Sequence, residues 1–157
     1  MKDKINYYIR QLKEVYEGEN WNDGNYLSKL ENIKEETAFK QPKAGIHSIA
    51  EIIWHLIFWR RAVLYRITGD YEFDKKAEKE QNFLTLEALK QKGWSNLLDE
   101  LKQSQNGLIN FLSTKTDDVL DIEYKPGRKL EVEIEGIVHH DIYHLGQIGL
   151  VIAMLRE

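Results

Sequence analysis

The chain has 157 residues, a formal net charge of −4, no cysteine and an ordinary balance of apolar (42%) and charged (31%) residues, so it is most simply one domain, residues 1–157. The absence of cysteine excludes disulfides, thiolate metal ligands and a cysteine nucleophile, and the acidic balance argues against general nucleic-acid binding, which needs a basic patch. No apolar run reaches the length of a membrane span. The start, Met1 to Lys4, lacks the apolar core of a secretory signal, and we expect a cytoplasmic protein without membrane contact.

The first part of the chain is expected to hold one long and one short helix. Apolar residues at helical spacing predict a helix over about residues 4–17, which Gly18 ends. A shorter apolar stretch that begins at Tyr26 predicts a short helix, before a loop that contains Pro42 and Gly45. We assign this connection to the same domain.

The next helix has a marked start. Ser48 and Glu51 form a capping-box pattern, in which each side chain can bond the other residue's backbone amide. The pattern predicts a helix from there to about Thr68, and its apolar residues wrap most of the way round, so we expect it to be buried. Arg60 and Arg61 within it are expected to flank the helix in solvent, or to meet an anionic substrate at a pocket mouth.

A charged passage over residues 70–82 is expected to form a surface loop or a frayed helix. A third long helix follows, which starts at about Leu86 or at Gly93 and ends at Ser113. Its apolar stripe contains no obvious metal ligand, so we do not expect it to contribute to a metal site.

The last part of the chain contains a turn and a long helix. Pro126 and Gly127 form a strong turn signal, and residues 122–124 and 129–130 on either side can pair briefly as extended strands. The final helix is predicted over about residues 132–155. Four long helices without an internal repeat predict an all-α, up-and-down four-helix bundle, with room for one longer crossover. The facing helices of such a bundle build sites in its interior.

Two histidines in the final helix have the spacing of metal ligands. His140 and His144 lie one turn apart on the same helix face, with Cβ atoms about 5–6 Å apart, so both imidazoles can converge on one ion. The motif argues against a zinc peptidase of the zincin type, because Asp141 takes the position of the glutamate and only Glu157 could follow as a ligand. A divalent ion normally needs a third protein ligand, which must come from an earlier helix.

His55 is the best candidate for the third ligand, because it sits centrally in the strongly apolar stretch 52–65. Glu51 is a reserve ligand, although its capping role competes with this. His47 is expected to be a loop residue that packs or lines an entrance. The competing interpretation of the histidines is that they are hydrogen-bonded core residues of a bundle without metal. Imidazole suits Zn, Ni, Cu and Fe alike, so ligand type leaves the metal open.

Further residues are candidates for the surroundings of the site. Gln147 lies one turn below the histidine pair and can orient a ligand or bind a neighbouring helix. Asp141 is expected to be solvated or to hydrogen-bond a ligand from behind. Trp54, Trp59 and Tyr143 are expected either to shape the pocket or to belong to the core.

The segments that carry these residues resemble the DinB/YfiT-like superfamily. The segment His47 to Leu56, followed by Trp59, looks like its second-helix motif, and the segment Glu135 to Ile148 looks like its last-helix motif. Further likenesses occur in chain order: Trp21 after the first helix, Trp94 at the start of the third, and Pro126-Gly127-Arg128 before the fourth.

The resemblance implies a four-helix bundle in which three histidines hold a divalent metal, and the matching positions are His55, His140 and His144. It also implies frequent homodimers and, in some relatives, metal-dependent transfer to low-molecular-weight thiols or thiol-dependent isomerisation. Nothing in the resemblance implies contact with DNA.

Our leading hypothesis is a metal-dependent enzyme that acts on small molecules, a thiol S-transferase, with Zn²⁺ or Ni²⁺ as the expected metal. A metal-dependent hydrolase uses the same ligands with water in the open position. The alternative from another class is a non-catalytic module for metal binding and dimerisation.

Overall fold

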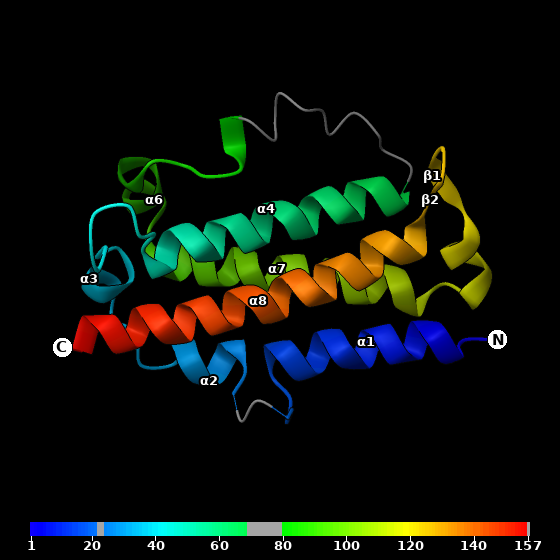
Figure 1. Ribbon diagram of the computed structural model, residues 1–157, viewed down its shortest axis with the longest axis horizontal. Helices are drawn as coiled ribbons and strands as arrows, with labels where there is room; N and C mark the ends of the chain where they lie inside the picture. Colours follow the sequence, from blue (N-terminus) through cyan, green and yellow to red (C-terminus); the bar gives the residue numbers. More distant parts are fainter. Residues whose placement is uncertain (22–23, 69–79, 157) are drawn as a thin grey trace.

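Four long helices lie side by side in the computed structural model, which describes residues 1–21, 24–68 and 80–156 (Figure 1). Both α4 and α1 pack against α7 and α8. The predicted all-α bundle is confirmed. Because α4 and α7 run in the same direction and α1 and α8 in the opposite one, the helix directions do not alternate strictly, and the connection from α4 to α7 is the crossover, since it joins two parallel helices. The bounds of the four helices are α1 Asp3–Tyr16, α4 Ile49–Thr68, α7 Trp94–Ser113 and α8 Leu130–Arg156.

The helix α4 begins with the predicted capping box. The backbone N–H of Ser48 donates to Glu51 Oε2 (2.8 Å), and the backbone N–H of Glu51 donates to Ser48 Oγ (3.3 Å). Every residue of the helix from Ile49 to Phe58 is buried because α7, α8 and α6 (Leu86–Lys92) all pack against it. The predicted buried helix is therefore confirmed, and it forms one wall of the bundle interior.

The third predicted helix is in fact two. Thr85 caps α6 by accepting from the backbone N–H of Ala88 (3.2 Å), and α6 ends before Gly93. Gly93 has a φ of +83°, which an L side chain rarely adopts, so the chain turns there before α7 begins. Both of the starts that the sequence allowed are therefore real.

The smaller elements connect the bundle helices. The hairpin was expected, and its register pairs Glu123 with Lys129 and Lys125 with Arg128. Three of the elements are only four or five residues long. The short helix α2 was predicted from its apolar residues, whereas α3 and η1 were not, because they contain too few apolar residues to show a helical period. The elements are α2 Tyr26–Leu30, α3 Glu35–Ala38, the 3₁₀-helix η1 Asp117–Asp121, β1 Glu123–Lys125 and β2 Arg128–Lys129.

An ion pair in the bundle interior corrects two expectations. Arg60 on α4 and Asp141 on α8 are fully buried, and Asp141 Oδ2 accepts from Nη2 (2.7 Å) and Nε (3.0 Å) of Arg60. The sequence had suggested solvated positions for both side chains. Neither side chain is solvated, because each neutralises the charge of the other across the helix interface. Tyr26 packs beside the ion pair, and its hydroxyl donates to the backbone oxygen of Asp141 (2.6 Å). Arg61 does flank the helix, where it pairs with Glu100 (2.8 Å).

Most of the charged passage 70–82 lies outside the described residues. Its last residue, Asn82, is half-buried and accepts a hydrogen bond from Trp59 Nε1 (3.0 Å), so this part is not simply surface. Among the described residues, no helix combines the length and the apolar character that a membrane crossing needs.

Candidate metal centre

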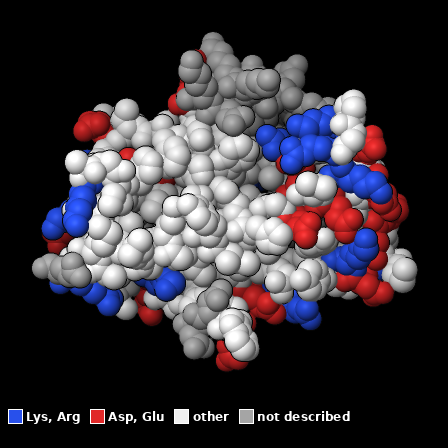
Figure 2. Space-filling view, in the orientation of Figure 1, with Lys and Arg blue, Asp and Glu red and all other residues white. Residues whose placement is uncertain are grey.

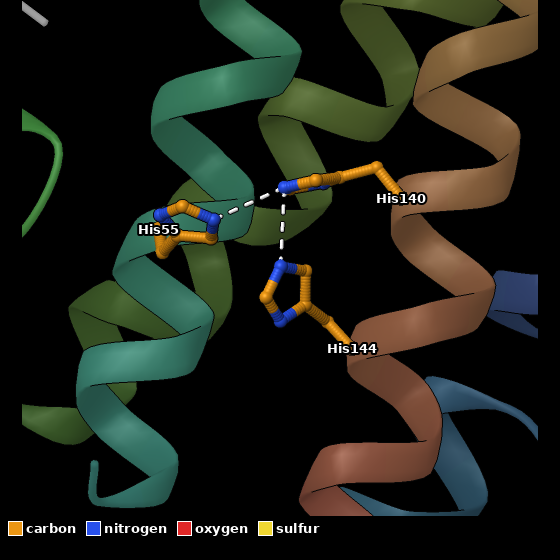
Figure 3. A group of neighbouring side chains, drawn as sticks. All are labelled: His55, His140 and His144. Atoms are coloured by element: carbon orange, nitrogen blue, oxygen red, sulfur yellow. Dashed lines mark hydrogen bonds between the residues drawn. The ribbon is translucent and has the colours of Figure 1, made fainter.

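Three histidine side chains from two helices point toward one another (Figure 3). His55 comes from α4, and His140 and His144 come from α8. The Nε2 atom of His140 lies 3.0 Å from that of His55 and 3.1 Å from that of His144. His55 and His144 are buried and His140 is half-buried. The structure thus brings together the three residues that the sequence proposed as ligands, in a group that could hold a metal ion.

Gln147 defines the tautomer of His144. Its Oε1 lies 2.6 Å from His144 Nδ1, and its Nε2 donates to the Tyr143 hydroxyl (2.9 Å). Because an amide oxygen only accepts, the proton of the neutral imidazole sits on Nδ1 of His144, and Nε2 presents its lone pair to the other two rings. Gln147 therefore orients a candidate ligand, which is the first of the two roles predicted for it.

The other two rings have their Nδ1 atoms buried without a hydrogen-bond partner among the described residues. A neutral imidazole carries one proton, so three facing nitrogens at about 3 Å can satisfy one another only in part. A cation between them would accept all three lone pairs. Ligand distances of about 2.0–2.1 Å place neighbouring nitrogens about 3.3 Å apart around a tetrahedral ion and about 2.9 Å apart around an octahedral one. The separations of His140 from His55 and from His144, 3.0 and 3.1 Å, lie between these values. All three ligand nitrogens lie within 4.8 Å of one another, so the residues could hold a divalent metal.

Electrostatics keeps the triad neutral. Burial and the neighbouring His144 lower the pKa of His55 to about 4, and burial and both other triad rings lower that of His140 to about 3. Burial also lowers the pKa of His144, although the hydrogen bond to Gln147 opposes this. The rings are therefore uncharged at neutral pH, which is the form that binds metals.

A cavity of about 640 Å³ opens at the triad. Its walls include Trp59, Tyr143 and Gln147, together with His47, which was expected at an entrance. Phe83 stacks on the ring of His55, a member of the triad, and on the ring of His47 outside it. The centroid distances are 4.4 Å to His55 and 4.2 Å to His47. Phe83 was not predicted as a site residue, because its only signal in the sequence is that it is an aromatic residue directly after a charged passage.

Two predicted pocket residues have other contacts. Trp54 is not among the described residues that line the cavity, and its Nε1 donates to the backbone oxygen of Gln81 (2.7 Å). Glu51 caps α4 and does not belong to the triad, so its role as reserve ligand is not used. Burial alone would raise the pKa of Glu51, but hydrogen bonds from Ser48, Gln41 and His47 outweigh it and the pKa is lowered.

One of the comparisons with known proteins gives a match. The sequence model described as the DinB superfamily matches residues 20–148, a span that includes all three histidines of the triad. The chain therefore belongs to the DinB superfamily. No curated protein and no solved structure gives a significant match to the chain.

Proposed function

We propose that this protein is a divalent-metal-dependent enzyme that acts on small molecules, with His55, His140 and His144 as the ligands of Zn²⁺ or Ni²⁺. The observation that carries the proposal is the convergence of three neutral imidazoles at a cavity of about 640 Å³. Three protein ligands leave a coordination position for substrate, which is typical of catalytic metal sites, and the cavity has the size of a small-molecule site.

The reaction that we propose is transfer of an organic group from an electrophilic small molecule to a low-molecular-weight thiol. The thiol sulfur forms a bond to the electrophilic carbon, the bond from that carbon to its leaving group breaks, and the leaving group carries away the electron pair while the thiol gives up its proton. A divalent ion held by the triad would lower the pKa of a thiol bound to it and so supply a thiolate at neutral pH. Gln147 keeps the proton of His144 on Nδ1, away from the site. Phe83 covers one face of the His55 ring, and the apolar side chains of Ile52 and Val151 line the same cavity, where they exclude competing water. A thiol-dependent reaction needs a reducing compartment, and we propose the cytoplasm as its place.

A second candidate function, a metal-binding dimerisation module, is supported by an exposed stripe on α8. Along α8, exposed residues without carboxylate, ammonium or guanidinium groups recur at steps of three and four, the spacing of a helix–helix contact. Figure 2 shows an uncoloured surface over the middle of α8. This stripe supports a homodimer, and a metal-binding dimerisation module is the alternative to the enzyme. The stripe consists of Val132, Gly136, His139, Tyr143, Gly146, Leu150 and Ala153.

Elemental analysis of protein purified without a histidine tag tests the metal site. We expect about one Zn²⁺ or Ni²⁺ per chain in the wild type and none in His55→Ala or His144→Ala. The matched control is His139→Ala, which removes an exposed histidine of α8 next to the triad and should keep the metal. Equal metal in all four proteins would refute the triad as the site.

The reaction is tested on metal-loaded protein with a panel of thiols and electrophiles. We expect transfer activity that is absent from His144→Ala. A panel without any transfer removes the transferase, and activity with water alone in place of the thiol makes the protein a hydrolase. The dimer is tested by light scattering of wild type and Leu150→Glu: a wild-type dimer that the variant dissociates, in the absence of any transfer, would favour the dimerisation module.

A further inference from the structure

A second cavity, of about 380 Å³, lies against the same part of the bundle. Trp59 and His140 line both this cavity and the one at the triad, so the two cavities adjoin at these side chains. The rest of the lining comes from the end of α4, from the β1–β2 hairpin and from the first turns of α8. A small molecule that extends from one cavity into the other would therefore pass along these side chains.

The lining of the second cavity is basic, although the chain as a whole is acidic. The described lining residues include three basic side chains and one carboxylate. The basic side chains are Arg66, Lys125 and Arg128, and the carboxylate is that of Glu133. Figure 2 shows Lys and Arg side chains gathered, beside acidic ones, at the end of the molecule where the hairpin meets α4 and α8. The excess of positive charge favours an anion in this cavity.

The one carboxylate holds Arg66 in place. Glu133 Oε2 accepts from Arg66 Nη1 (2.7 Å), and its other oxygen accepts from the hydroxyl of Tyr124. The guanidinium also lies over the ring of Trp59, 5.6 Å from its centroid. A guanidinium fixed in this way loses little side-chain entropy when it binds the oxygens of a ligand. Lys125 and Arg128 are exposed and add charge at the rim.

We propose that this cavity binds the anionic group, a carboxylate or a phosphate, of the small molecule that reacts at the triad. The inference rests on the proposed function for the identity of that molecule as a substrate, but the anion site itself is defined by the cavity and its charges. The inference narrows the substrate class to small molecules that can place an anionic oxygen group in this cavity, beside Trp59 and His140, while their reacting group lies at the triad.

Calorimetric titration of metal-loaded protein with succinate, with inorganic phosphate and with neutral succinamide tests the site. We expect succinate or phosphate to bind and succinamide not to bind, and the tighter of the two anions identifies the group. In the variant Lys125→Gln/Arg128→Gln, anion binding should weaken at least about tenfold, because two charged donors are lost. The matched control, Lys13→Gln/Lys102→Gln, removes two exposed charges elsewhere and should change it less than about twofold.

The variant His144→Ala separates this site from the metal. It should lose the metal but keep anion binding within about threefold, since its side chain lines only the cavity at the triad. Binding that is lost in His144→Ala but kept in Lys125→Gln/Arg128→Gln would show that the anion coordinates the metal, and would overturn the inference. Equal binding in the basic variant and its control, or none in the wild type, would also overturn it. Anion binding as expected without any thiol transfer refutes the transferase and leaves the anion site in place.

Discussion

Replacing Asp141 by Asn should strongly destabilise the protein. The substitution leaves the guanidinium of Arg60, which is fully buried, without its counter-charge, and arginine cannot release its proton to escape the penalty. Breaking a buried pair in this way costs about 3–5 kcal/mol, a large share of the 5–15 kcal/mol that usually holds a domain together. Urea unfolding of the chelator-treated protein, followed by circular dichroism, measures the loss.

The complementary substitution, Arg60→Met, should behave differently with pH. Burial already raises the pKa of Asp141 even though Arg60 opposes it, and without Arg60 the pKa rises further. A carboxyl group whose pKa is raised on folding destabilises the folded state increasingly as the pH rises from its unfolded pKa toward its folded pKa, so the variant should be less stable at pH 7 than at pH 5. Relative to wild type, its deficit should shrink by up to about 2.7 kcal/mol between pH 7 and pH 5, whereas Asp141→Asn, which has no titrating group at this position, should show no such gain in acid.

The double variant Arg60→Met/Asp141→Leu controls for lost packing. It removes both charges and leaves an apolar contact of similar volume, so it should recover most of the stability that either single change loses. The reasoning is refuted if Asp141→Asn costs less than about 1 kcal/mol, or if the double variant is as unstable as the sum of the single ones, because the pair would then not be a coupled buried unit.

Three further outcomes are expected. The variant Glu51→Gln should lose about 1 kcal/mol of stability at pH 7 in urea unfolding, and less as the pH falls below about 4.5, because the lowered pKa of Glu51 makes its contribution vanish in acid. Gln147→Leu should weaken metal binding about 10–100-fold in chelator competition, whereas Tyr143→Phe, which keeps the amide oxygen of Gln147 on His144, should weaken it far less. Chelation should lower the melting temperature of the wild type but not of His144→Ala, and equal shifts in both would contradict a metal bound by the triad.

Local patterns in the sequence predicted the parts of the site that lie on single helices. The capping box places Ser48 and Glu51 three residues apart, and the pair His140 and His144 is four apart, so helix geometry alone relates them. The choice of His55 needed only the assumption that a buried helix faces another in a bundle. The structure brings these residues together as expected.

Contacts between distant segments were not predictable in the same way. Arg60 and Asp141 are 81 residues apart, and a charged side chain carries no sign of whether its partner will be another charge or water. Phe83 reaches the triad because of how its segment lies on α4, which no period of the sequence specifies. The second cavity joins residues of α4, the hairpin and α8, so it exists only in the assembled bundle.

The position of the buried ion pair along the helices has a geometric consequence for the triad. Arg60 follows His55 by five residues on α4, and Asp141 comes directly after His140 on α8, so the pair acts on the two helices that carry the ligands. Sliding one helix past the other by a turn would move its side chains by about 5.4 Å, far more than the reach of any metal–nitrogen bond. The ion pair sets the registry of the two helices before an ion arrives, so loading and removing the metal should leave the backbone folded, unlike a zinc finger, which unfolds without its ion.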